Sequence, residues 1–199
     1  MSPLAKCANR ILFRGKHVCP RWLCFTFDNV FRRYFQDPAA LLLPYVREGD
    51  TAIDVGPGIG FFTIPLAERV GDSGRVIAVD IQQSMLDALR RRAVKRGVAS
   101  RISTHRASEK SLGISAEADF ILAFWMVHEV PDRERFFGEL RELLKPQGLF
   151  LLAEPGIHVT ASMFDRIVAD AETAGFEVRS RPHIAFSRAV VLVKGRAAE

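Results

Sequence analysis

The chain has 199 residues, of which 48% are hydrophobic and 26% charged. This composition is typical of a globular protein and excludes an intrinsically disordered one. No apolar run reaches the roughly 20 residues of a membrane-spanning helix, and no signal peptide is recognisable, so we expect a cytoplasmic protein without a membrane span. Residues 1–37 carry the whole net charge of +5, with seven Lys or Arg against two Asp, and the remainder has 21 basic and 21 acidic residues.

The N-terminal segment is basic and aromatic. Aromatic residues at positions 27, 31 and 35 predict a helix over 25–35, and a second short helix is expected over 39–45. We interpret residues 1–46 as an appendage or lid, and residues 47–199 as one domain. A basic segment can meet nucleic acid, anionic lipid or an acidic substrate, or can be an ordinary solvated surface.

The three cysteines also lie in this segment, at Cys7, Cys19 and Cys24. Their odd number argues against a disulfide framework, and their spacing is not that of a zinc site. They are either small hydrophobic residues or a thiol cluster for a soft substrate.

A glycine-rich turn follows the first predicted strand. The apolar run 51–55 ends in Asp54-x-Gly56-x-Gly58-x-Gly60, and a helical pattern begins at Phe61 and runs to about Val70. A strand, a glycine turn and a helix bring backbone close to a small ligand at the carboxyl edge of an α/β sheet. The spacing matches neither the dinucleotide fingerprint nor a Walker loop.

Strands and helices alternate after this turn, which is typical of a parallel sheet. Strands are expected at 75–79, 101–106, 118–124 and 149–153, with helices at 83–97, 132–145 and 160–174. Two last strands, at 176–178 and 189–193, predict a C-terminal antiparallel hairpin. Asp80 ends the second strand, where an acid accepts hydrogen bonds from ribose hydroxyls or serves as a helix N-cap.

The helix 83–97 contains Leu86, Leu89 and Val94, which we expect to face inward. Its basic residues (Arg90, Arg91, Arg92, Lys95 and Arg96) resemble a nucleic-acid patch. They also lie near the helix C-terminus, where cations complement the helix dipole, and this second interpretation is favoured.

Over about residues 50–195 the chain resembles the class I S-adenosylmethionine-dependent methyltransferases. The resemblance rests on Asp54-x-Gly-x-Gly-x-Gly60, Val76-Ile-Ala-Val-Asp80, Leu144-Lys-Pro-Gln-Gly148, and the stretch Asp119–Asp132 with Glu154-Pro155-x-x-His158. It implies a Rossmann-like, seven-stranded α/β sheet with helices on both faces and an antiparallel C-terminal strand. It also implies S-adenosyl-L-methionine as cofactor.

The resemblance implies cofactor contacts for the turn, for the residues after strands two and three, and for the tip of strand four: Asp54, Gly56, Pro57, Gly58, Gly60, Asp80, Ile81, Ser108 and Phe124. Pro57 replaces the Cys or Thr common in relatives, and Ser108 stands where they often place Asp. His128 would face the substrate pocket.

His128 and Glu129 are the candidate catalytic residues, because an imidazole can act as a general base near neutral pH. His128 can equally be a packing or capping histidine. Glu154 and His158 lie at the same edge, but no spacing in this region is typical of a metal site, so no metal is expected.

The sequence predicts a methyltransferase that acts on a small molecule. The tetrapeptide of amino-nitrogen nucleic-acid methyltransferases and the Pro-Cys pair of cytosine C5 enzymes are both absent. Two alternatives stay open: an RNA methyltransferase that uses the basic segment, and a non-catalytic protein that binds the cofactor.

Overall fold

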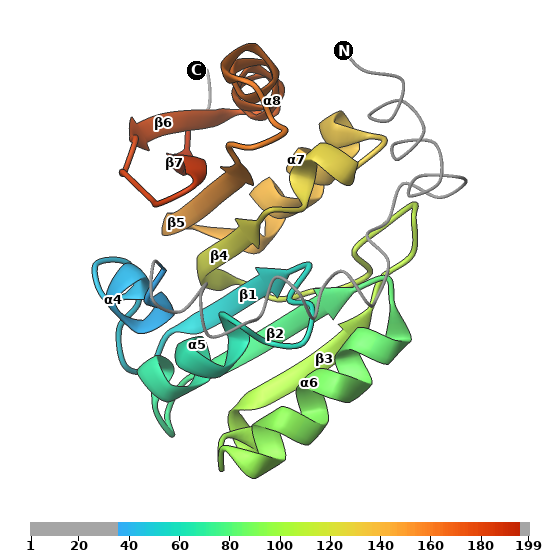
Figure 1. Ribbon diagram of the computed structural model, residues 1–199, viewed down its shortest axis with the longest axis vertical. Helices are drawn as coiled ribbons and strands as arrows, with labels where there is room; N and C mark the ends of the chain where they lie inside the picture. The colour runs from blue at the N-terminus through green and yellow to red at the C-terminus, as the bar shows by residue number, and fades with distance from the viewer. Residues whose placement is uncertain (1–35, 196–199) are drawn as a thin grey trace, which may run out of the picture.

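A computed structural model describes residues 36–195 of the chain. These residues form one seven-stranded sheet with the strand order β3-β2-β1-β4-β5-β7-β6 (Figure 1). The helix predicted over 25–35 and the three cysteines lie outside the described residues.

The first five strands are parallel. They are β1 (Thr51–Val55), β2 (Arg75–Asp80), β3 (Ile102–Arg106), β4 (Ala118–Phe124) and β5 (Leu144–Pro155). The last two, β6 (Phe176–Ser180) and β7 (Ser187–Lys194), form an antiparallel hairpin, and β7 also pairs antiparallel with β5. This confirms the predicted sheet and its C-terminal hairpin.

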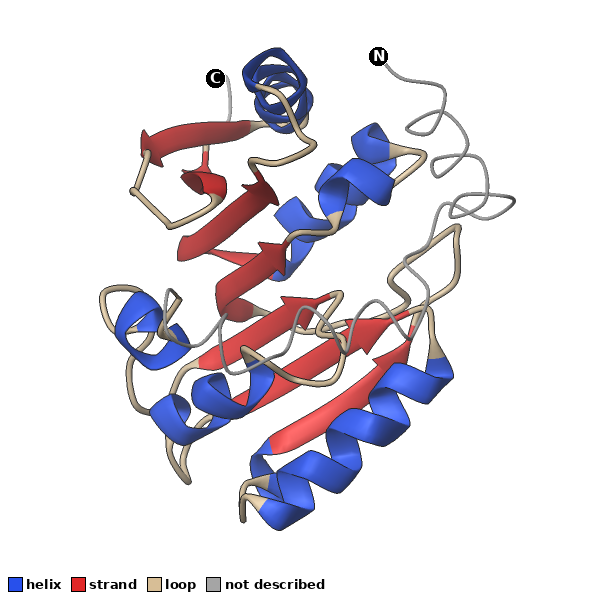
Figure 2. Cartoon of the chain, in the orientation of Figure 1, coloured by secondary structure: helices blue, strands red, loops and turns tan. Residues whose placement is uncertain are grey.

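Helices cover both faces of the sheet (Figure 2). Alternate residues of a strand belong to two separate apolar clusters: in β4, Phe120 and Leu122 lie in one cluster and Ile121 and Ala123 in the other. The first cluster includes residues of α4 (Pro38–Leu42), α5 (Thr63–Val70) and α6 (Gln83–Lys95). The second includes residues of α7 (Arg133–Leu143) and α8 (Ala161–Thr173). Because both faces of the sheet are covered, a central strand such as β4 is a nearly continuous apolar run.

Three details differ from the sequence-based expectation. Helix α5 begins at Thr63, two residues after the expected start. Val94 is 68% exposed, because it lies five positions after the buried Leu89 and so points away from the sheet, whereas Ala93 points toward it. Strand β5 begins at Leu144, five residues before the expected start, and its pairing with β4 is irregular there.

Two short 3₁₀ helices, η1 (Ala99–Arg101) and η2 (Val127–Glu129), complete the described elements. None of the helices within residues 36–195 is long and apolar enough to cross a membrane.

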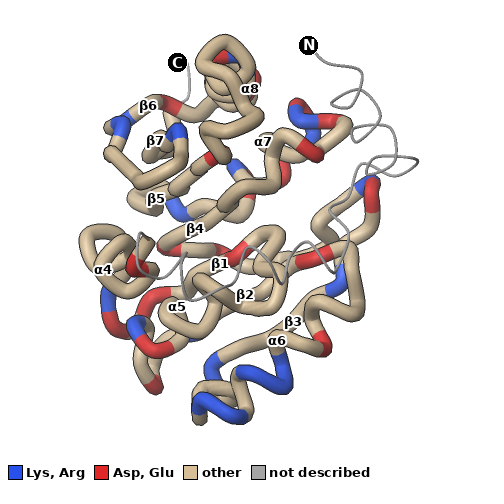
Figure 3. The backbone as a smooth tube through the Cα atoms, viewed as in Figure 1, with Lys and Arg blue, Asp and Glu red and all other residues tan. Residues whose placement is uncertain are grey.

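Basic residues gather along α6 (Figure 3), and three of them have partners within residues 36–195. Arg90 lies 3.1 Å from Asp87, and Arg96 lies 2.6 Å from Glu68 of the neighbouring helix. Arg92 donates to the backbone carbonyl of Ile59. Arg90, Arg92 and Arg96 are thus held against α5, α6 and the glycine turn.

The start of the described chain is attached to the C-terminal hairpin. Gln36 is buried, and its amide donates to the carbonyl of Ala185 and to Ser187 Oγ, at 2.5 and 3.3 Å. Leu42 and Val46 are fully buried in the apolar cluster that holds α5. Residues 36–46 are therefore packed against the methyltransferase-like sheet.

Candidate active site

The candidate site lies at the carboxyl ends of β1, β2, β4 and β5. The strand order places β1 between β2 and β4, so the loops after β1 and β4 diverge to opposite faces of the sheet. Such a switch point is where open α/β sheets bind their ligands.

The glycine turn after β1 needs glycines because of its backbone angles and, at two of the three positions, because neighbouring side chains leave no room for a Cβ. Gly56, Gly58 and Gly60 all have positive φ angles, of 69°, 54° and 92°. A Cβ on Gly56 would lie 2.9 Å from Met126 Cγ, and one on Gly60 would lie 2.3 Å from Leu89 Cδ1. A Cβ on Gly58 would meet no protein atom within 4 Å. Side chains of the protein thus pack against Gly56 and Gly60, whereas the space beside Gly58 is open.

Backbone hydrogen bonds hold the turn in place. The Gly56 N–H donates to the carbonyl of Val79, at 2.9 Å, which ties the turn to β2. The Gly60 N–H donates to the carbonyl of Pro57, at 3.0 Å, and Pro57 is buried. The Pro57 carbonyl thus closes the turn.

Asp54 is buried beneath the turn. Its carboxylate accepts a 2.6 Å hydrogen bond from the Thr63 hydroxyl in the first turn of α5, and its exposed fraction is 2%. Burial raises the pKa of Asp54 to about 7, with a smaller contribution from the charge of Asp80, while the Thr63 hydrogen bond opposes the rise. The side chain joins β1 to α5 and so supports the turn from below.

The Asp54→Asn variant is expected to have a flatter dependence of stability on pH than the unmodified protein. The pKa of the Asp54 carboxyl is about 7 in the folded protein, against an ordinary 3.8. As pH rises, the unfolded chain therefore loses the Asp54 proton at a lower pH than the folded protein does. Stability is therefore lost as pH rises between those values, by on the order of 4 kcal/mol from this group. Urea unfolding at several pH values measures the difference. In the control Asp72→Asn, which breaks an exposed ion pair with Arg101, the curve should parallel that of the unmodified protein.

Asp80 connects the end of β2 to the glycine turn. Its carboxylate accepts a 2.8 Å hydrogen bond from the Gln82 N–H. Burial raises the pKa of Asp80 to about 6, the N–H groups of Gln82 and Gly58 oppose the rise, and the charge of Glu129 adds to it. Asp80 thus lies beside Gly58, the open position of the turn.

Two other predicted cofactor residues border this region. Ile81 is half-buried directly after Asp80. Phe124 is 7% exposed at the end of β4, and its ring packs on Phe62 with a centroid distance of 4.4 Å. The residue that follows, Trp125, has a φ of 63°, which is costly for a bulky side chain. Its indole N–H donates to Ser187 Oγ, at 2.9 Å.

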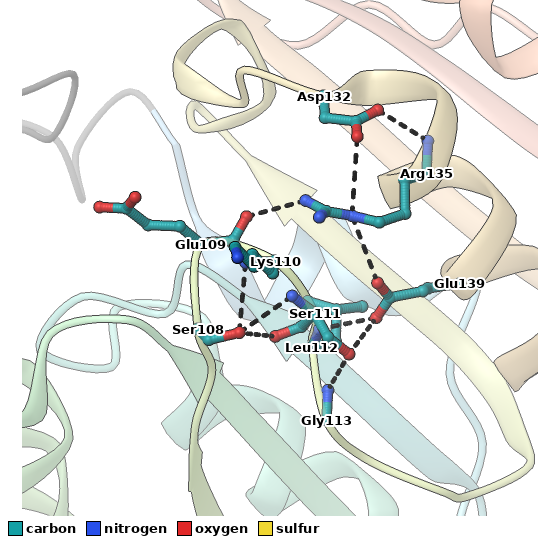
Figure 4. A network of polar contacts seen from close by, with 9 residues as sticks. All are labelled: Ser108, Glu109, Lys110, Ser111, Leu112, Gly113, Asp132, Arg135 and Glu139. Atoms are coloured by element: carbon teal, nitrogen blue, oxygen red, sulfur yellow. Dashed lines mark hydrogen bonds and ion pairs between the residues drawn. The ribbon is translucent and has the colours of Figure 1, made fainter.

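Ser108 organises the loop after β3 (Figure 4). Its hydroxyl oxygen accepts hydrogen bonds from the N–H groups of Lys110 and Ser111, at 3.2 and 3.0 Å. Glu139 of α7 holds the far side of this loop by accepting from the Leu112 N–H at 2.6 Å. Ser108 therefore shapes the loop, an interaction that the sequence did not reveal.

The predicted catalytic residue His128 is held by Glu154. Glu154 is fully buried at the end of β5, and one of its oxygens accepts from the N–H groups of Val127 and His128, at 2.8 and 3.3 Å. Its other oxygen is hydrogen-bonded to His128 Nδ1. Burial alone would lower the pKa of His128, but the hydrogen bond and charge of Glu154, with the charge of Glu129, raise it above its usual value.

The sequence placed Glu154 and His158 at this edge but gave neither a role. The second nitrogen of His128, Nε2, lies 3.0 Å from His158 Nε2, and Glu129 Oε1 lies 3.9 Å from the same His128 atom. The partner that fixes His128 is thus Glu154, 26 residues away, rather than its neighbour Glu129. Over residues 36–195, no group of three or more His, Cys, Asp or Glu side chains is arranged to hold a metal ion.

Comparison with known proteins supports the same class. Residues 52–148 match the family model described as "Methyltransferase domain". The structure of a SAM-dependent methyltransferase from Aquifex aeolicus superposes with a TM-score of 0.78 at 22% identity, covering 88% of this chain and 98% of that one. Residues 52–148 are therefore similar to a methyltransferase domain, and the described residues share the fold of a SAM-dependent methyltransferase.

Two curated relatives are named as methyltransferases of quinone compounds. The ubiquinone/menaquinone biosynthesis C-methyltransferase UbiE of Brucella anthropi is 34% identical over 116 residues, which is 58% of this chain and 44% of the relative. The demethylmenaquinone methyltransferase of Lactobacillus johnsonii is 32% identical over 104 residues, or 52% of this chain and 43% of the relative. The chain thus spans about half the length of the curated relatives it matches.

Proposed function

We propose that the protein transfers a methyl group from S-adenosylmethionine to a small molecule. The observation that carries the proposal is that the candidate cofactor residues and His128 lie at the same edge of the sheet. There the open position at Gly58 adjoins Asp80, and the charge of Glu129 acts on both Asp80 and His128. This neighbourhood supports a cofactor cradle beside a proton acceptor, which is the arrangement that methyl transfer to a protonated acceptor requires.

The residues present fit the cofactor. A Cβ on Gly58 would project into open space, so a ligand can approach the backbone there, as the methionine part would. Asp80 is an acceptor for the ribose hydroxyls, and Ile81 lies next to it for contact with the adenine. The cofactor supplies an electrophilic methyl group on sulfur.

Glu154 and His128 supply the proton acceptor. The Glu154 carboxylate fixes the imidazole by its Nδ1 atom and stabilises the positive charge that the ring acquires on protonation. The same pattern, a carboxylate that orients a histidine base, recurs in acid–base catalysis on unrelated folds. The chain would thereby increase the nucleophilicity of an acceptor that carries a weakly acidic proton.

The names of the relatives direct the choice of acceptor. UbiE of Brucella anthropi is a C-methyltransferase of quinone biosynthesis. We propose by analogy a ring carbon of a hydroxylated aromatic compound as methyl acceptor. Loss of a phenolic proton would make such a carbon nucleophilic, in keeping with a base at this edge. Reduced 1,4-naphthoquinone with methyl-labelled cofactor is the first probe, and label in the organic extract is the expected result.

Asp80→Ala is expected to weaken binding of S-adenosylhomocysteine by about 1.5–3 kcal/mol, the contribution of hydrogen bonds to a charged group. This corresponds to a loss of about 10- to 150-fold in Kd, measured by titration calorimetry. The control Asp87→Ala removes an exposed carboxylate on α6 that pairs with Arg90, and should leave Kd unchanged. Unchanged affinity in Asp80→Ala would remove Asp80 from the site.

The same titration separates the proposal from its alternatives. Failure of the folded protein to bind S-adenosylhomocysteine would refute the enzyme function. Binding without turnover over a broad panel of acceptors would indicate a non-catalytic cofactor-binding protein. Salt-sensitive binding of RNA, with methylation of that RNA, would indicate the RNA methyltransferase.

A lid role for residues 1–46 also remains a proposal. It is supported by Gln36, whose amide donates to Ser187 Oγ, the same atom that accepts from the indole of Trp125 after β4. The cytoplasmic location is a prediction that cell fractionation would test.

A further inference from the structure

A chain of hydrogen bonds links a buried carboxylate to the protein surface. It runs from Glu154 at the end of β5, through His128 of η2, to His158 in the turn that follows β5. The exposed fraction rises along this chain. Glu154 is fully buried, the His128 side chain is 16% exposed, and His158 is exposed. The outer member of the chain is therefore His158.

The hydrogen bonds determine where the protons reside. The Glu154 carboxylate only accepts, so Nδ1 of His128 carries a hydrogen. In neutral His128 the other nitrogen, Nε2, is then an acceptor, and its 3.0 Å contact requires a hydrogen on His158 Nε2. That tautomer leaves Nδ1 of His158 as an acceptor. Because His128 Nε2 is in contact with His158, a proton that enters this chain of hydrogen bonds from solvent or substrate binds His158 first.

We propose that His158 is the residue that takes up the proton from the methyl acceptor, and that His128, against Glu154, is where the positive charge comes to rest. A proton from the acceptor binds Nδ1 of His158 while the Nε2 hydrogen of His158 moves to Nε2 of His128. The acceptor's electron pair forms the bond to the methyl carbon, and the electrons of the carbon–sulfur bond remain on sulfur. This inference deepens the proposed function and rests on it for its role in catalysis.

The charges around the two rings favour this direction of transfer. Glu154 and Glu129 face His128, and together they raise its pKa. Burial and the nearby charge of His128 lower the pKa of His158, with Glu154 opposing. A single proton on the pair is therefore more stable on His128.

The relay makes a specific prediction about tautomers. In the neutral pair, His158 carries its hydrogen on Nε2. Once His128 is protonated, its own Nε2 hydrogen points at His158, so His158 must carry its hydrogen on Nδ1. His158 is thus expected to change tautomer at the same pH at which His128 becomes charged, and to become charged itself only at lower pH.

Nuclear magnetic resonance of the full-length protein labelled with ¹⁵N-histidine tests this without any substrate. Spectra from about pH 9 to about pH 5 should show the His158 switch together with protonation of His128. His183 is the internal control and should show no tautomer change coupled to the protonation of His128. A constant tautomer of His158 throughout the protonation of His128, or protonation of His158 before His128, would overturn the relay.

Variants identify the contribution of each member. Glu154→Gln should lower the midpoint for protonation of His128 by about one pH unit or more and abolish the coupled switch. Glu129→Gln, whose carboxylate lies 3.9 Å away, should lower it less and keep the switch. His158→Gln keeps a donor near His128 and should leave His128 with its hydrogen on Nδ1. An unchanged His128 midpoint in Glu154→Gln would contradict the proposal.

Binding of S-adenosylhomocysteine in the same samples distinguishes the two proposals. Tight binding without the tautomer switch would overturn the relay alone. The switch without binding would uphold the proton transfer and refute the methyltransferase function.

Discussion

Gly58→Ala is expected to weaken binding of S-adenosylhomocysteine severely while the protein stays folded. A methyl group at this position meets no protein atom within 4 Å, so it projects into the space that the cofactor would fill. Crowding of this kind costs about 1–3 kcal/mol, which corresponds to a loss of about 5- to 150-fold in affinity. Titration calorimetry measures the loss.

Backbone strain is the alternative explanation for such a loss, and Gly97→Ala controls for it. Gly97 ends α6 with a φ of 71°, close to the 54° of Gly58, and a Cβ there also meets nothing within 4 Å. Both variants should lose about 1–2 kcal/mol of unfolding free energy, because both place a side chain in the left-handed region. Only Gly58→Ala should show weaker binding of S-adenosylhomocysteine. Equal affinity in the two variants would show that the turn does not touch the cofactor.

Glu154→Ala is expected to lower the free energy of unfolding by about 3–5 kcal/mol, the usual cost of removing one member of a buried ionic pair. It leaves the N–H groups of Val127 and His128, and the His128 ring, without their acceptor. Urea unfolding measures the change. Glu129→Ala is the matched control, because this carboxylate is 31% exposed and lies 3.9 Å from the ring, so its loss should cost about 1 kcal/mol or less.

The pH dependence of this effect has a definite sign. Glu154 raises the pKa of His128 in the folded protein, so the pair adds stability below the ordinary pKa of histidine, and that stability is lost as pH rises through the raised value. The difference between the unmodified protein and Glu154→Ala should therefore be smaller at about pH 9 than at about pH 6. A larger difference at the higher pH would show that His128 is not charged by this contact.

The sequence by itself determined the elements and their order along the chain. Apolar runs such as Ala118–Phe124 are buried on both sides, and a strand buried on both faces has little choice of partner but a covered parallel sheet. The glycine turn was recognisable because three glycines at alternate positions serve backbone angles that other residues avoid. The positions of Asp54 and Asp80 at strand ends followed from the same local patterns.

Only the tertiary structure decided which side chains meet. The sequence named His128 and Glu129 as candidate catalytic residues, but it did not indicate the contact with Glu154, which the β4–β5 pairing brings to the ring from 26 residues away. Likewise, the local pattern did not indicate that the buried Asp54 carboxylate meets the Thr63 hydroxyl. A local sequence pattern indicates the backbone conformation of the segment that contains it. Contacts between side chains depend on strand register and burial, which the whole sheet sets at once.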